Sequence, residues 1–578
     1  MQVRTALTLV SLASLWAWPA LSIAAEGVVN CEGEYRHHLQ GVCGDGESLY
    51  WSFTTTMVKT DLRGKRLKQV EVVNHHGDVC LAAGRLYCAV NLGRFNDPEG
   101  NADCWVYVYD PTTLKIVSKH PVQQVKHGAG GMAFDGERFL VVGGLPDGVE
   151  QNYVYEYDLD LKFVKKHTIR SGWTRLGIQT ATFAEDAWWF GCYGGQTLKT
   201  DSELKMLGRF NFDCSLGVME QRGGGLLVAS GVSQAGKCTG KIESARADHS
   251  LGLIVDRPLT RIGFGSCIKQ AQPAPIFKTV LKSRPQVFLY IGDNIYADTD
   301  DMKVMRAKYK TLAGNADFQK LRLSCPSLAV WDDHDYGVND GGSSYSKRDA
   351  SQVEFLDFWG EAANSPRREQ QGIYDAKIIG PVGKRTQFIL LDTRYFRGEL
   401  NKGEKRTGGP YYPLDDKRTP MLGERQWKWL TAQLRKPAEL RIVATSIQLL
   451  ASSAGQETWS NLPHERRRFL ALLKSTAAEG VVLISGDRHW SELSALSDGV
   501  PYPLYDLTSS SMNQIHPRGT PTMNDHRLAK ETYHRENYGM LLVDWDQADP
   551  SIVMQVLDVD GKTRIEHSIR LSELAARR

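Results

Sequence analysis

A repeated pattern of turn and strand fills the first half of the chain and constrains the fold more than any other feature. Each repeat has a turn rich in Gly or acidic residues and then an apolar strand: GESLYWS from Gly46, GRLYCAV from Gly84, GERFLVV from Gly136, EDAWWFG from Glu185 and GGLLVAS from Gly224. Between them, a strand ending in Asp leads through a turn to Leu, as at Asp158 and Leu161. Turn-bounded strands with a period of about 40 to 50 residues are typical of a β-propeller.

We therefore predict an all-β, propeller-like domain over residues 27–255, with five blades and a ring closed near the N-terminus. Closure is expected because an open sheet edge invites aggregation. Histidines lie near several first strands: His38, HHGD from His75 to Asp78, and HGAGG from His127 to Gly131. Because first strands line the channel of a propeller, these histidines could converge there as a ligand or metal site. The alternative is that they are polar channel residues satisfied by backbone groups and water.

The first 25 residues have the layout of a secretory signal peptide. Arg4 gives a positive start, Ala6 to Trp18 is mostly apolar, and small residues follow up to Ala25. We predict cleavage near Ala24 or Ala25 and export to the periplasm or the medium. The alternative is a membrane anchor, but a spanning helix needs about 20 apolar residues and this run is shorter. No later segment is long and apolar enough to span.

Export would place the cysteines of the front half in an oxidising compartment. An even set in an oxidising compartment favours disulfides, although the sequence leaves their pairing open. The set is Cys31, Cys43, Cys80, Cys88, Cys104, Cys192, Cys214 and Cys238.

The net charge is only +3, so the field of the whole chain gives no reason to expect nucleic acid or an anionic membrane as a partner.

From Arg261 onward, apolar strands alternate with helical stretches, which predicts an α/β domain with helices outside a layered sheet. Five strands are each followed by charged or reactive side chains, and such groups gather on loops at the carboxyl ends of strands. Arg261–Phe264 precedes GSC, Val287–Ile291 precedes GDNIYAD, Leu328–Trp331 precedes DDHD, Gln387–Leu391 precedes DTRYFR, and Val481–Ile484 precedes SGDRHW.

These residue types suit a site with more than one metal ion. Carboxylates, a phenolate and a thiolate are anionic enough to hold di- and trivalent cations. Two metals about 3.5–4 Å apart can activate a water and stabilise the entering and leaving oxygens of a phosphoryl transfer. Each residue alone has a plainer explanation, such as a buried Cys267, a core Tyr296 ring or a satisfied His489. It is the five strand ends together that favour the metal site.

These motifs resemble those of the alkaline phosphatase D (PhoD-like) family of metallophosphatases. The resemblance runs from about Pro258 to Leu571, in a domain that we place at residues 258–578. It implies a calcineurin-like, four-layer α/β/β/α sandwich that hydrolyses phosphate mono- and diesters. The matching segments are GSC, FLYIGDNIYAD, WDDHDYGVND, LLDTRYFR, LGERQWKWL, ISGDRHW and LYDLTSSSMN.

The resemblance also assigns roles to residues. It implies that the tightly held metal is iron, with the ligands Cys267, Asp293 and Tyr296. It implies that Asp487 bridges to a second metal, calcium, near Asn339 and Asp333, and it leaves open which acid of DDHD binds. It implies that the side chains facing the phosphate are His334, His489 and Arg394. The propeller is not part of the usual family pattern, so the natural substrate stays open.

The sequence thus predicts an exported, metal-dependent phosphoesterase in which a metal-activated water attacks phosphorus and His334 or His489 moves a proton. No GxSxG nucleophile elbow surrounds Ser266, and no phosphoenzyme is needed. Ser509 to Ser511 could shape the rim of the pocket or form a plain polar loop. The alternative function is a propeller protein that binds a glycan or an envelope partner and carries a degenerate phosphatase-like domain.

Overall fold

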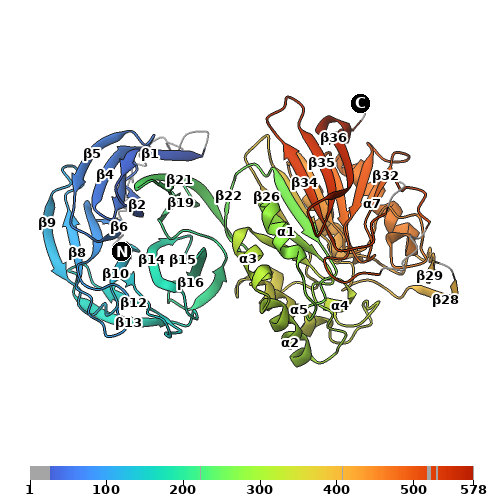
Figure 1. Cartoon of the computed structure of the whole chain (residues 1–578), viewed down its shortest axis with the longest axis horizontal. Coiled ribbons are helices and arrows are strands. Elements are labelled where there is room, and N and C mark those ends of the chain that lie inside the picture. The colour runs from blue at the N-terminus through green and yellow to red at the C-terminus, as the bar shows by residue number, and fades with distance from the viewer. Residues whose placement is uncertain (1–26, 222, 407, 517–522, 529–531, 577–578) are drawn as a thin grey trace, which may run out of the picture.

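A computed structural model describes residues 27–221, 223–406, 408–516, 523–528 and 532–576. Over these ranges the chain forms a ring of β-strands and, beside it, an α/β sandwich (Figure 1). The predicted signal peptide falls on residues 1–25, which lie outside the described residues.

The first four blades of the ring are antiparallel sheets whose strands follow the order of the chain. In the first three blades the innermost strand is largely buried and the outermost is the most exposed, so the blades pack face to face around one axis. The blades are β2 (Leu39–Gly44), β3 (Ser48–Phe53), β4 (Thr56–Asp61) and β5 (Arg66–Glu71); β6 (His76–Ala82), β7 (Arg85–Asn91), β8 (Cys104–Tyr109) and β9 (Ile116–Pro121); β10 (Ala129–Phe134), β11 (Phe139–Gly143), β12 (Asn152–Tyr157) and β13 (Phe163–Ile169); and β14 (Arg175–Ala184), β15 (Ala187–Tyr193), β16 (Gln196–Thr200) and β17 (Met206–Phe210).

The fifth blade joins the two ends of the propeller sequence. Its strands run in the order β18 (Val218–Glu220), β19 (Leu226–Ser230), β21 (Lys237–Asp248) and β1 (Val28–Tyr35), with β20 (Ser233–Gln234) and β22 (Gly252–Val255) also paired to β21. The N-terminal β1 pairs antiparallel with β21, and Val28 lies opposite Glu243. The N-terminal strand therefore closes the ring, and the predicted five-bladed propeller is confirmed.

The pattern of Asp, turn and Leu has a local physical cause. The Asp158 carboxylate accepts hydrogen bonds from the backbone N–H groups of Asp160 (3.0 Å) and Lys162 (2.8 Å). This side-chain turn reverses the chain, and Leu161 then adopts a left-handed backbone (φ 57°) and buries its side chain. Asp201 makes the same turn. One turn chemistry thus repeats from blade to blade.

The disulfide prediction is wrong for the described chain. All ten cysteines are free thiols, and all are buried. They pack as small apolar side chains in separate layers of the core, for example Cys31, Cys192 and Cys214 in three different clusters. Burial raises the pKa of the Cys192 thiol to about 12, so this thiol is not reactive.

Two six-stranded mixed sheets form the second domain. The first has the order β25 (Ser327–Val330), β24 (Val287–Ile291), β23 (Arg261–Gly265), β34 (Asn537–Asp544), β35 (Ser551–Asp558) and β36 (Thr563–Arg570). The second has the order β26 (Asp375–Ile379), β27 (Thr386–Leu390), β30 (Leu440–Ala444), β31 (Val481–Ser485), β33 (Leu504–Thr508) and β32 (Glu492–Leu496). One hydrophobic core runs through both sheets.

Helices lie outside the two sheets and complete the sandwich (Figure 1). Beside the first sheet are α1 (Ile276–Ser283), α2 (Met302–Ala313), α3 (Ala316–Ser324) and α5 (Arg348–Trp359); α6 (Gly423–Leu434) and α7 (Pro463–Thr476) pack together beside the second. Short elements are α4 (Asp333–Tyr336), η1 (Pro366–Arg368), η2 (Trp459–Asn461), η3 (Leu571–Leu574) and the hairpin β28 (Asn401–Arg406) and β29 (Gly409–Tyr412). This confirms the predicted metallophosphatase-type sandwich. Within the described ranges, no helix is long and apolar enough to cross a membrane.

A buried ion pair joins the two domains. Lys377 on β26 contacts Asp248 on β21 at 2.7 Å, and both side chains are at most 10% exposed. Beside it, the backbone N–H of Ala363 donates to the carbonyl of Leu207 at 2.7 Å. The fifth blade therefore packs directly against the edge of the second sheet.

We expect this ion pair to make stability depend on pH in the acid range. Burial alone would raise the pKa of Asp248, but Lys377 and backbone N–H groups outweigh it and lower the pKa from 3.8 to about 2. Such a carboxylate contributes about 2 kcal/mol of stability above pH 3.8 and loses it as the pH falls towards 2.

Asp248→Asn should therefore lower the free energy of unfolding near neutral pH, and its difference from the wild type should shrink below pH 4. Chemical denaturation across pH measures both. The control is Asp160→Asn, whose partner Lys162 is 75% exposed, and this change should cost less than about 1 kcal/mol. A deficit for Asp248→Asn that does not change with pH would contradict the assignment.

Candidate metal centre

The carboxyl ends of parallel strands from both sheets meet at one place. β23, β24 and β25 run parallel in the first sheet, and β27, β30, β31 and β33 run parallel in the second. The loops that follow them carry Cys267, Asp293, Asp332, Asp333, Arg394, Asp487, His489 and Ser510. Side chains far apart in sequence are thus brought to one edge by strand direction.

Four of these positions have a strained backbone. Cys267 (φ 60°), Asp293 (φ 51°), Asp487 (φ 64°) and His489 (φ 55°) all adopt the left-handed conformation without being glycine. This conformation is uncommon for residues with a Cβ, and it is concentrated at functional sites where the surrounding structure enforces it. The strands thus end in turns that aim these side chains inward.

The first group of donors contains a thiol, a carboxylate, a phenol and an imidazole. Cys267 Sγ lies 3.5 Å from Asp293 Oδ2, and Tyr296 Oη lies 3.2 Å from the same oxygen and 3.4 Å from His489 Nε2. One donor atom each from Cys267, Asp293 and His489 lies within 4.8 Å of the others. The predicted ligands Cys267, Asp293 and Tyr296 are therefore together.

The His489 ring is fixed in one tautomer. Its Nδ1 is hydrogen-bonded to the Gln514 carbonyl, which can only accept, so Nδ1 carries the proton. Burial lowers the pKa of His489 to about 4, which leaves a neutral ring whose Nε2 lone pair points at Tyr296. A neutral imidazole with its other nitrogen bonded to a carbonyl is the usual form of a metal-ligating histidine. His489 was predicted to face the phosphate, and the structure places it in the donor group of Cys267.

Beside the first group lies a second group made of carboxylates. Donor oxygens of Asp332, Asp333 and Asp487 lie within 4.8 Å of one another, and Asp293, Asp333 and His334 form a further set. Asp293 and Asp333 thus each belong to more than one set. Asp487 was predicted to bridge two metals. In the structure, Asp293 is the acid that belongs both to the set with Cys267 and to a set with Asp333.

Three acids of this centre each have one carboxylate oxygen without a hydrogen-bond partner. Asp293 Oδ1, Asp332 Oδ2 and Asp333 Oδ1 are buried and have no hydrogen-bond partner among the described residues. Burial and then the neighbouring Cys267 raise the pKa of Asp293 well above its usual value, and burial and then Asp332 do the same for Asp487. Unpaired buried carboxylates are costly, so the donor set fits bound cations. Sulfur, nitrogen and phenol donors suit a transition metal, and carboxylates alone suit a hard cation.

Asn339, a predicted ligand, is exposed at the surface. Its neighbour Asp340 donates its backbone N–H to Asp333 Oδ2 at 2.7 Å. Carboxylate oxygens of Asp333, Asp340 and Glu457 lie within 4.8 Å of one another. Near position 339, the side chain close enough to share a cation with Asp333 is therefore that of Asp340.

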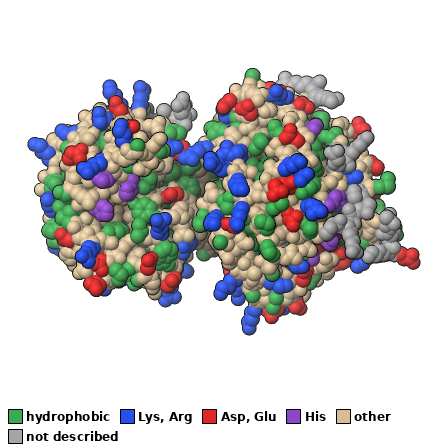
Figure 2. Space-filling view, viewed as in Figure 1, with side chains coloured by type: hydrophobic (Ala, Val, Ile, Leu, Met, Phe, Trp, Pro, Cys, Tyr) green, Lys and Arg blue, Asp and Glu red, His purple; other side chains and the backbone are tan. Residues whose placement is uncertain are grey.

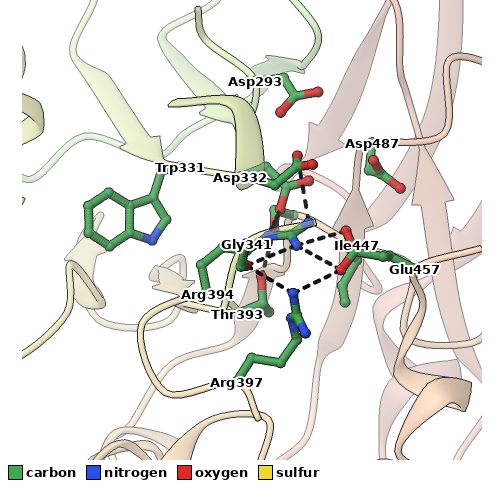
Figure 3. Close-up of polar contacts among 12 residues, drawn as sticks. Asp293, Trp331, Asp332, Gly341, Thr393, Arg394, Arg397, Ile447, Glu457 and Asp487 are labelled. Carbon is green, nitrogen blue, oxygen red and sulfur yellow. Dashed lines mark hydrogen bonds and ion pairs between the residues drawn. The ribbon is translucent and has the colours of Figure 1, made fainter. Parts of the chain in front are cut away.

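Arg394 lies beneath the acids and is fully buried (Figure 3). Its Nε donates to Asp332 Oδ1 at 2.5 Å, and its Nη1 lies 2.7 Å from Glu457 Oε2. Arg397 contacts the other oxygen of Glu457 at 3.1 Å. Arg394 was predicted to face the phosphate; in the structure it is occupied in holding Asp332 and Glu457, so we describe it as a positioning residue.

His334 stands at the open side of the centre. Its Nδ1 lies 2.6 Å from Asp298 Oδ1, and its ring centroid is 4.2 Å from that of Tyr296. Burial alone would lower its pKa, but the Asp298 hydrogen bond and the Asp333 charge outweigh burial and raise the pKa to about 9. His334 is therefore a proton-bearing donor beside the carboxylates, and its side chain is 17% exposed.

One residue of the centre carried no strand-end signal. Glu457 lies in the loop between β30 and η2, well beyond the strand end. Ser510 accepts the backbone N–H of His489 at 2.7 Å and lies 3.2 Å from Cys267 Sγ. The serine run was predicted as a pocket rim or a plain polar loop, and in the structure Ser510 is buried behind the thiol.

The second domain combines a two-sheet sandwich with a candidate metal centre at its strand ends. Residues 263–533 match the family model described as PhoD-like phosphatase, so the chain carries a domain of that family. Alkaline phosphatase D from Bacillus subtilis (strain 168) is 23% identical over 261 residues, which is 38% of this chain and 44% of that protein. The chain thus spans less than half the length of this curated relative.

Two solved structures align with parts of this chain. The structure of PhoD aligns with 77% of this chain and 92% of its own, with a TM-score of 0.46 and 14% sequence identity. The WD40 domain of Neurospora crassa Pan2 aligns with 36% of this chain and 62% of its own, with a TM-score of 0.22 and 13% identity.

Proposed function

We propose that the chain is a metal-dependent phosphoesterase that hydrolyses phosphate mono- or diesters in its C-terminal domain. One observation carries the proposal: buried carboxylate oxygens without partners converge with a thiol, a phenol and an imidazole at the strand ends. The match of residues 263–533 to the PhoD-like phosphatases supports the same reaction class.

The donor chemistry suggests which metals these residues would hold. Cys267, Asp293, Tyr296 and His489 would hold iron, because thiolate, phenolate and imidazole prefer transition metals. The acids of the second group would hold calcium, because it prefers oxygen ligands. Such ions, when bound, lower the pKa of water and neutralise charge on the phosphoryl oxygens.

The protein itself supplies positioning and a proton. His334 is protonated at neutral pH and can donate to a phosphoryl oxygen or to the leaving oxygen of the ester. Asp298 holds the ring in place through Nδ1, which leaves Nε2–H for this donation. Arg394 orients Asp332 through a hydrogen bond and opposes the rise that burial causes in the pKa of that carboxyl. Catalysis then needs no covalent phosphoenzyme.

We also propose that the protein is exported, on the pattern of residues 1–25. N-terminal sequencing of the mature protein should begin near Glu26. Recovery of a cell-associated chain that still begins at Met1 would contradict cleavage.

Elemental analysis paired with a substrate panel tests the proposed activity. The purified protein should contain stoichiometric iron and calcium and should hydrolyse aryl phosphates. A chelator should abolish turnover, and added metal should restore it. Comparing mono- and diaryl phosphates shows which ester is preferred. Metal-free protein with no hydrolysis after metal is added would instead favour the binding protein with a degenerate phosphatase-like domain.

A further inference from the structure

A blind cup lies on the axis of the propeller, far in sequence from the metal centre. It has a volume of about 420 Å³ and is lined from the β2, β6, β10 and β14 blades. Figure 2 shows histidine side chains gathered at the centre of the propeller face. Cavities of about 300–1,000 Å³ are typical of small-molecule sites.

Close packing of the innermost strands closes the floor of the cup. A Cβ on Gly77 would lie 2.2 Å from the carbonyl oxygen of Gly130, and one on Gly131 would lie 2.4 Å from that of Gln179. Below them the buried Asp78 accepts the backbone N–H of Ala181 at 3.0 Å. Backbone therefore fills the axis beneath the cup, so the cup is not a through-channel.

Two buried glutamines leave acceptor oxygens unused at this cavity. Gln40 donates its side-chain N–H groups to His38 Nε2 and Thr54 Oγ1, both at 3.1 Å. Gln179 donates its own to the Leu176 carbonyl at 2.6 Å. Neither side-chain carbonyl accepts a hydrogen bond from the described residues, although the two side chains are only 7% and 3% exposed. Solvent in the cup can reach such acceptors, and the hydroxyls of a ligand are suitable donors to replace it.

A single permanent charge stands at the mouth of the cup. The Arg175 side chain forms no hydrogen bond or ion pair with the described residues, and no Asp or Glu is among the described residues that line the cup. The loop before it is held rigidly, because Asn152 donates to Ser171 Oγ (2.8 Å) and Thr174 Oγ1 (2.9 Å). An unpaired guanidinium that extends from a fixed backbone suits an anionic group.

The histidines of the cup add aromatic surface rather than a metal site. The ring of His75 meets the edge of Phe95 with centroids 6.0 Å apart, and Tyr193 Oη lies 3.0 Å from His38 Nε2. The groups of acids, thiols and histidines close enough to share a metal all lie in the C-terminal domain, as far as the chain is described. Of the ligand site and the metal site considered for these histidines, the structure therefore favours a site for a small molecule.

We propose that this cup binds a sugar-sized ring that carries both hydroxyls and an acidic group. The hydroxyls donate to the carbonyl oxygens of Gln40 and Gln179, and the carboxylate or phosphate pairs with Arg175. The apolar face of the ring rests on Phe95. This site does not depend on the reaction in the other domain.

Isothermal titration of the full chain with glucuronate, glucose 6-phosphate and glucose tests the proposal. Saturable binding of at least one acidic sugar is expected, and glucose should bind at least about 10-fold more weakly. A preference between the two acids identifies a carboxylate or a phosphate as the natural group. Phosphate release is followed in parallel, so that hydrolysis at the metal centre is distinguished from binding in the cup.

Arg175→Gln should weaken the acidic sugar by at least about 10-fold and leave aryl phosphate hydrolysis unchanged. Gln179→Leu should weaken all the sugars. Arg170→Gln, a change at an exposed arginine outside the cup, is the matched control and should bind as the wild type. No saturable binding of either acidic sugar, or equal binding by the wild type and Arg175→Gln, would overturn the proposal even if Gln179→Leu fails to fold.

Discussion

Asp293→Asn is expected to lower aryl phosphate hydrolysis by more than about 100-fold while the fold is kept. Asp293 is shared between the group of Cys267 and His489 and a group that contains Asp333, so its loss weakens both. Changes even one shell away from a metal cost about 10–100-fold in affinity or activity, and a shared ligand should cost more. Turnover, iron content and calcium content measured on one preparation check this.

The same change should not destabilise the metal-free protein. Without a cation, the Asp293 carboxylate is buried with one oxygen unpartnered, and asparagine has nearly the same shape without the charge. Thermal unfolding of chelator-treated samples should therefore give the variant a midpoint no lower than that of the wild type. In the presence of metals the order should reverse, because only the wild type gains the free energy of binding.

Asp506→Asn is the matched control. Asp506 is equally buried in the second sheet, but it accepts hydrogen bonds from Ser485 Oγ (2.7 Å) and from the backbone N–H groups of Leu449 (2.9 Å) and Leu450 (3.0 Å). Its replacement should cost about 1–3 kcal/mol of stability with metal content kept. Wild-type turnover and metal content in Asp293→Asn would remove this residue from the site.

Features that depend on local chemistry could be predicted from the sequence. The blades follow from an Asp-centred turn repeated along the chain, and the strands before Cys267, Asp293 and Asp487 follow from short apolar runs. Parallel strand direction then places the loops at one edge without further information. This is why the propeller, the sandwich and the convergence of these loops could be anticipated.

Features that depend on distant backbone could not be predicted in this way. The tautomer of His489 is set by the carbonyl of Gln514, and Glu457 reaches the centre from the middle of a loop. The disulfide prediction was wrong for a related reason. Counting cysteines gives their number but not the strand faces, and the packing places these thiols as buried, separate core residues.

The role of Arg394 also depends on packing between segments that are distant in the sequence. A phosphate clamp would be open to substrate, whereas the Arg394 side chain is 0% exposed and lies between Asp332 and Glu457. Arg394→Met should therefore destabilise the protein by about 3–5 kcal/mol, the usual cost of leaving buried charges without their partner. Denaturant titration measures this loss.

Glu457, which contacts Arg394, provides a second test of the positioning role of Arg394. Burial raises the pKa of Glu457 to about 7 even though the charges of Arg394 and Arg397 oppose it. Without Arg394 this carboxyl should take up a proton, so Glu457→Gln placed in the Arg394→Met background should change the free energy of unfolding little. Arg418→Met, at a side chain that is 91% exposed, should be near neutral. If Arg394→Met instead keeps wild-type stability and raises KM alone by 10-fold or more, then the guanidinium contacts the substrate and the positioning role is wrong.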